Sequence, residues 1–112
     1  MTMVEVLILT DLPELVLFDR GGVQTISLLS KEKIDGCFWL TAPFPGVEAL
    51  RHLSVRDVFT QPGVTAHFGT PDELLAGESS LPVDKNLISE DWLPNIGWKL
   101  PAWVQFPSWA NS

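Results

Sequence analysis

Few side chains in this sequence could carry out chemistry, and their spacing limits what they could do. The chain holds a single cysteine, Cys37, and two histidines, His52 and His67. A thiol beside an imidazole can act as a nucleophile with its base, and Cys and His are common ligands of zinc. A zinc site needs three or four such ligands. The histidines lie 15 residues apart without a Cys or His at ligand spacing, so we predict no metal site.

Catalysis is not indicated either. Cys37 precedes Phe38 and Trp39, which predicts a buried cysteine, and buried thiols are mostly inert. The sequence contains no Gly-x-Ser-x-Gly elbow, P-loop or Gly-x-Gly-x-x-Gly turn. Glu5 and Glu14 lie in or beside predicted strands, and the sequence leaves open which way they face. We predict no catalytic residue, no cofactor and no enzymatic activity. The alternative is a small enzyme or ligand-binding domain that uses a carboxylate or a histidine in an aromatic cleft.

The charge balance limits the partners. Seven basic residues stand against 14 acidic ones, which gives a net charge of -7. Phosphate backbones and anionic membrane surfaces repel such a chain. The longest unbroken apolar runs are four residues, against roughly 20 for a bilayer span. We expect a cytoplasmic protein that binds neither nucleic acid nor membranes, and whose partners are proteins, especially basic ones.

The acidic residues are concentrated between positions 72 and 91. This segment holds Lys85 as its only basic residue, against Asp72, Glu73, Glu78, Asp84, Glu90 and Asp91. Such a run is either a solvated surface or an acidic patch that faces a basic partner.

Tryptophans crowd the C-terminal tail, where chains are usually polar. The last 21 residues contain the five aromatic residues that we predict as partner-binding: Trp92, Trp98, Trp103, Phe106 and Trp109. Each aromatic side chain buries about 150–250 Å² when covered. The tail therefore closes the core of its own domain, contacts a partner or second subunit, or lines a ligand-binding groove. Prolines that stiffen the tail suit either of the first two interpretations.

The elements that must position these side chains are short. Alternating and β-branched segments predict strands at 4–9, 15–18, 23–30, 37–42 and 64–68. Apolar spacing and capping signals predict helices at 46–53, 55–60 and 71–76. Gly21 and Gly22 predict a tight hairpin turn. The first four strands follow one another through short polar turns, which is typical of an antiparallel meander.

Local signals mark several boundaries. Two pairs resemble capping boxes, namely Ser54 with Asp57 and Thr70 with Glu73. The charged segment 31–36 is predicted to be a loop, and 77–86 a linker. Ser89 is expected to cap a single turn, and the stretch from Trp98 to Phe106 to hold at most a short edge strand, since prolines interrupt it.

The predicted fold class is therefore α+β. With 112 residues, of which 46% are hydrophobic, the chain is long enough for one core without disulfides. We expect a single domain over residues 1–112, with an antiparallel meander sheet of four to five strands and two or three short helices. The Pro/Trp-rich tail, residues 89–112, is expected to pack on this domain or across a dimer.

Four short motifs carry a resemblance to a known family. They are Leu-Val-Leu-Phe-Asp-Arg-Gly-Gly at 15–22, Phe-Trp-Leu at 38–40, the stretch 50–59 that ends in Ser-Val-Arg-Asp-Val-Phe, and Ser-Glu-Asp-Trp-Leu-Pro-Asn-Ile-Gly at 89–97. Over roughly residues 4–97 the chain resembles a family of small, acidic, uncharacterised bacterial proteins that share a domain of unknown function. It departs from them at Val55 and Val58 and in its Trp-rich extension. The resemblance implies a bacterial or phage origin and the meander layout, and it implies no catalytic residue.

Together these features favour a non-enzymatic protein-interaction module that is homodimeric. A narrower version is an acidic inhibitor or immunity-type protein that imitates nucleic-acid charge, although -7 is a modest charge for that role.

Overall fold

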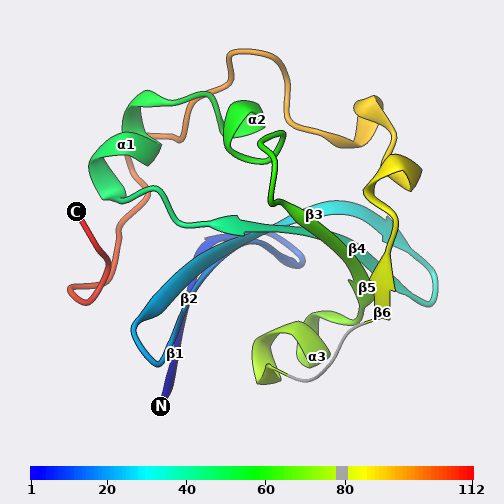
Figure 1. Ribbon diagram of the computed structural model, residues 1–112, viewed down its shortest axis with the longest axis horizontal. Helices are drawn as coiled ribbons and strands as arrows, with labels where there is room; N and C mark the ends of the chain where they lie inside the picture. The colour runs from blue at the N-terminus through cyan, green and yellow to red at the C-terminus, as the bar shows by residue number, and fades with distance from the viewer. Residues whose placement is uncertain (78–80) are drawn as a thin grey trace.

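The computed structural model describes residues 1–77 and 81–112 (Figure 1). Over these residues the chain forms one antiparallel sheet of six strands in sequence order. The strands are β1 (Thr2–Leu9), β2 (Pro13–Arg20), β3 (Val23–Lys33), β4 (Gly36–Pro43), β5 (Thr65–Gly69) and β6 (Leu81–Val83). The helices are α1 (Val47–His52), α2 (Val55–Val58) and α3 (Pro71–Ala76), followed by the 3-10 turns η1 (Lys85–Leu87) and η2 (Glu90–Trp92). The α+β meander is confirmed, but the sheet has more strands than the four to five predicted.

The extra strand, β6, lies in the segment that we predicted as a linker, whose residues 78–80 are outside the described part. Its central residue Pro82 pairs with His67 of β5. Proline is tolerated in an edge strand because its missing N–H can lie on the open side. A three-residue segment with a central proline shows no alternation of apolar and polar residues, so the sequence gives no sign of β6. The strand is defined by its pairing with β5.

The first hairpins explain why the sheet is a meander. Arg20 and Val23 pair across Gly21 (φ 64°) and Gly22 (φ 90°), so the tight turn is confirmed. The predicted loop at 31–36 is wrong, because β3 continues to Lys33, which pairs with Gly36. Residues 31–35 are exposed to solvent, so this end of β3 needs no apolar residues.

Of the two predicted capping boxes, one is present. Thr70 Oγ1 accepts a hydrogen bond from the Glu73 amide (3.2 Å), and Glu73 Oε1 accepts one from the Thr70 amide (2.9 Å). The box at Ser54 is wrong, and α2 ends at Val58. Ser54 is held by an isolated β-bridge to Lys99, and its hydroxyl is buried with no hydrogen-bond partner among the described residues.

The sheet has an apolar cluster on each face, because successive strand residues point to opposite sides. Figure 1 shows α1, α2 and the tail on one side of the arched sheet and α3 on the other. The main core includes Leu17 and Leu50, and the second cluster includes Phe18, Trp39 and Leu74 of α3. Cys37 lies in this second cluster and is buried, as predicted. No helix in the described ranges is long and apolar enough to cross a bilayer.

Candidate partner-binding groove

The C-terminal tail crosses the face of the domain that carries α1 and α2 (Figure 1). Leu100 and Val104 are buried in the main core. The Val55 amide donates to the Trp98 carbonyl (2.9 Å), and the Arg51 guanidinium donates to the Val104 carbonyl (2.9 Å). The bridge between Ser54 and Lys99 is the extent of strand pairing in this stretch of the tail, so the predicted edge strand is reduced to one residue pair.

A buried side chain, Gln24, binds the backbone of Trp109 and Asn111 near the end of the tail. Its amide nitrogen donates to the Trp109 carbonyl (2.8 Å) and to Asp19 Oδ2 (2.9 Å). Its amide oxygen accepts from the Asn111 backbone N–H (2.8 Å). The hydrogen bond from Gln24, and a second from the Gly22 amide, lower the pKa of Asp19. We call Gln24, Asp19 and the backbone of residues 109–111 the tail latch.

Gly46 leaves space for the end of this tail. Its φ of 104° disfavours other residues, and a Cβ at this position would lie 2.8 Å from the Ser112 carbonyl. The next residue, Val47, donates its amide to the Asn111 carbonyl (2.9 Å). The tail end is therefore bound through its backbone, from β3 and from the start of α1.

The five predicted partner-binding aromatics divide into two groups. In the first group, Trp92 stacks on Phe38 (5.5 Å between ring centroids), and Phe106 lies under the Arg51 guanidinium (5.0 Å). Trp109, held by the tail latch, also packs on the main core.

The second group consists of Trp98 and Trp103, which are exposed to solvent. Trp98 is 39% exposed and Trp103 is 66% exposed. Between the buried Leu100 and Val104 the chain turns outward at Trp103. A partner-binding role for the five aromatics stays a prediction, and exposure favours these two.

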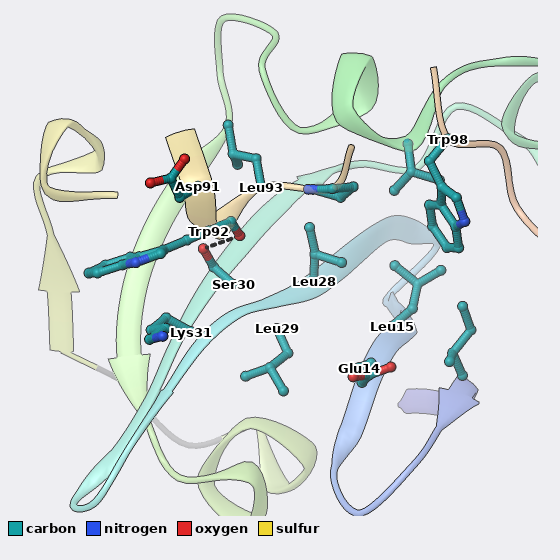
Figure 2. A pocket seen from close by; sticks show the side chains of 13 residues that line it. Glu14, Leu15, Leu28, Leu29, Ser30, Lys31, Asp91, Trp92, Leu93 and Trp98 are labelled. Carbon is teal, nitrogen blue, oxygen red and sulfur yellow. Dashed lines mark hydrogen bonds between the residues drawn. The ribbon is translucent and has the colours of Figure 1, made fainter. Parts of the chain in front are cut away.

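Trp98 lines a groove of about 330 Å³ between β2, β3 and the segment 91–98 (Figure 2). Leu15, Leu28 and Leu93 are among its apolar lining, and Glu14, Lys31 and Asp91 are its charged residues. The Ser30 hydroxyl donates to the Trp92 carbonyl (3.1 Å). This bond ties the segment 91–98, which forms one wall of the groove, to β3. In Figure 2 the indole of Trp92 points away from Leu28, while that of Trp98 lies on the side of Leu15.

This lining favours one kind of occupant. Two carboxylates and one ammonium group give the groove a net negative charge, and the half-buried Leu93 and the exposed Trp98 provide apolar contact area. An exposed indole attracts cations over its face, at about 0.5–1 kcal/mol in water-exposed sites. The groove therefore suits an apolar side chain next to a basic one.

The histidines are placed apart from this groove. His67 Nε2 lies 2.8 Å from Thr41 Oγ1, which lies 2.7 Å from Ser27 Oγ, so the three form a polar row on the second face of the sheet. Burial, and then the charge of Arg20, lower the pKa of His67. His52 is exposed at the end of α1. Within the described ranges, no three His, Cys, Asp or Glu residues gather as metal ligands would.

The acidic segment does not form one surface. Asp72 and Glu73 lie in α3 on one side of the sheet, whereas Glu90 and Asp91 lie in η2 near the opposite face (Figure 1). Glu78 lies outside the described residues. Among the described residues of this segment, only Asp91 lines the groove.

Sequence reasoning missed Glu14, Ser30 and Lys31 as groove residues and Gln24 as the centre of the tail latch. The groove residues come from separate segments, so no spacing within the chain links them. Gln24 did carry a signal, because Asp19 and Gln24 stand symmetrically about the Gly-Gly turn and pair across the hairpin.

Comparison of the chain with protein-family models, with curated proteins and with solved structures found no match.

Proposed function

We propose that this chain is a non-enzymatic protein-interaction module that binds a basic, partly apolar segment of a partner protein in the groove beside Trp98. The observation that carries the proposal is the exposed indole of Trp98 in a groove that also holds Glu14 and Asp91. Tryptophan is enriched among the residues that dominate binding energy at interfaces. The net charge of -7 favours encounter with a basic partner.

The local anchoring of the groove supports this proposal. Trp98 is fixed through its carbonyl by α2, and the Arg56 guanidinium donates to the Pro94 carbonyl (3.1 Å). Together with the bond from Ser30 to Trp92, these contacts hold the wall in place before a partner arrives. A preformed wall lowers the entropy that is lost on binding.

The test uses a short peptide of Lys and Leu residues as the probe. Its binding is monitored through the indole N–H signals of the tryptophans in two-dimensional NMR. We expect the Trp98 signal to shift and the affinity to fall with added salt, because the charged contacts are exposed. The same peptide with Glu in place of each Lys should leave Trp98 unshifted.

Matched variants separate the groove from general charge attraction. Trp98→Ala should weaken binding at least tenfold, as loss of an interface tryptophan does. Trp103→Ala is the control, since Trp103 is more exposed, belongs to the same tail and is not among the groove residues. Equal loss in both variants, or in neither, would contradict the proposed site.

A second candidate function is favoured by the size of the groove. About 330 Å³ lies at the lower end of the range for small-molecule sites. Native mass spectrometry of the freshly purified chain tests this alternative. A retained adduct that is lost in Trp98→Ala would assign the groove to a small ligand. A measured mass equal to that of the chain alone favours the peptide-binding function.

A further inference from the structure

The two edges of the sheet differ in what they offer to another chain. At one end, β6 is three residues long and includes Pro82, which has no N–H to donate. At the other end, β1 has eight residues, and among the described strands it pairs with β2 alone. An open strand edge presents unpaired N–H and C=O groups that can pair with a further strand. Of the two edges, β1 is therefore the one suited to strand addition.

The register of β1 shows which of its backbone groups point outward. The Gly21 amide donates to the Met1 carbonyl (3.2 Å), so these two residues form a hydrogen-bonded pair. In an antiparallel ladder such pairs alternate with pairs whose backbone groups point away. Met3 and Glu5 therefore bond to Asp19 and Leu17 of β2. It follows that the N–H and C=O groups of Thr2, Val4 and Val6 point to the open side.

These three residues are followed by an irregularity. The register with β2 shifts between Val6 and Ile8, which marks a β-bulge and ends the regular ladder. The regular outward set is thus centred on Val4, with one residue on each side at a spacing of two. A set that is symmetric about one residue matches a copy of itself rotated by 180°.

We propose that β1 is a dimerisation edge, at which β1 of a second copy pairs antiparallel about a two-fold axis through Val4. In this register Val4 meets Val4 of the second copy, and Thr2 meets Val6. Each of these pairs exchanges the outward hydrogen bonds, which joins the two sheets into one.

The side chains agree with this register. Glu5 is the only charged residue of β1, and it meets Met3 of the second copy, so like charges do not stand opposite each other. Val4 is 37% exposed, and its neighbour Val6 packs on the second cluster. Pairing would cover Val4 and extend that cluster across the axis. Residues 2–6, which pair in this dimer, are not among the residues that line the groove, so the dimer stands or falls independently of the proposed function.

Proline substitutions test the backbone geometry directly. By sedimentation equilibrium we expect the full chain to approach twice the 12.4 kDa of one copy as concentration rises. Val4→Pro removes only an outward N–H, so it should keep the monomer folded and weaken the dimer at least tenfold. Glu5→Pro removes an N–H that bonds β2, so its thermal midpoint should fall. A monomeric wild type, or a dimer that survives Val4→Pro, would overturn the proposal.

Charge substitutions at Val4, on the two-fold axis, test the register in two ways: each should abolish the dimer alone, and a mixture should restore it. Val4→Lys and Val4→Glu each place like charges opposite one another and should be monomeric alone. Their equimolar mixture should form a mixed dimer, because the charges are then complementary. Leu9→Lys, at an exposed site beyond the bulge, should dimerise like the wild type. A mixture that stays monomeric, or a dimer abolished by Trp103→Ser instead, would also overturn it.

Discussion

Replacing Gln24 with alanine should release the end of the tail. The substitution removes two hydrogen bonds to the tail, to the Trp109 carbonyl and from the Asn111 amide, both 2.8 Å long and part-buried. It also removes a third hydrogen bond, to Asp19 Oδ2 (2.9 Å). A neutral hydrogen bond contributes about 0.5–1.5 kcal/mol net. The two bonds to the tail alone therefore give an expected loss of about 1–3 kcal/mol in the free energy of unfolding, and the lost bond to Asp19 adds to it.

Two measurements follow this change. Urea unfolding monitored by fluorescence should show a lower midpoint, with little change in its slope because the core stays formed. Hydrogen exchange should show faster loss of protection at Asn111 and at Val47, whose amide donates to the Asn111 carbonyl. The buried residues Leu100 and Val104 lie before the released segment, so amides near them should keep their protection.

A glutamine elsewhere provides the control. Gln61 donates to the Asp57 carbonyl (3.1 Å) on an exposed surface, so Gln61→Ala should change stability by less than about 0.5 kcal/mol. Gly46→Ala should imitate Gln24→Ala, because its Cβ would meet the Ser112 carbonyl. If Gln24→Ala unfolds like the wild type and Asn111 exchanges unchanged, the tail latch does not hold the tail.

Three further predictions concern the rest of the fold. The pKa of His67 is lowered, first by burial and then by Arg20, so the native state favours the neutral ring. Its contribution to stability is complete above the unfolded pKa of about 6.5 and is lost as pH falls from there through the folded pKa. Urea midpoints at several pH values should show this loss in the wild type and less of it in His67→Gln. Thr70→Ala removes the capping box of α3 and should cost about 0.5–2 kcal/mol by the same assay. Burial, and then Glu32, raise the pKa of the Cys37 thiol, so a thiol reagent should modify it quickly only after denaturation.

The parts of the fold that the sequence predicted are those encoded within a few residues. Gly21 and Gly22 specify a turn by their backbone conformation alone. The Thr70 capping box and Gly77 define both ends of α3, and the helix matches the predicted residues 71–76. Alternation placed most of β3 and β5, and apolar runs placed most of β4 and the middle of β2, because these strands face a core.

The parts that it missed depend on contacts between distant segments. The same capping pattern succeeded at Thr70 and failed at Ser54, because Lys99 pairs with Ser54 from across the domain. Trp103 and Trp109 have the same side chain and similar proline-rich surroundings, yet one is exposed and the other packs on the core. The backbone of Trp109 is held by Gln24, which lies 85 residues away in the sequence.

The groove could not be predicted for the same reason. Its charged residues Glu14, Lys31 and Asp91 converge only once β2, β3 and the tail have packed together. The sequence did single out Trp98, as one of five aromatics, because tryptophans are unusual in a tail. It could not rank Trp98 among them, since ranking requires knowing which indoles the core covers.

The most direct test of the proposed function is the affinity of the Lys- and Leu-containing peptide for the wild type, Trp98→Ala and Trp103→Ala at low and high salt. We predict binding by the wild type that weakens with salt, at least tenfold weaker binding by Trp98→Ala, and little change in Trp103→Ala. Binding that is indifferent to Trp98 would contradict the assignment of the groove as the partner site.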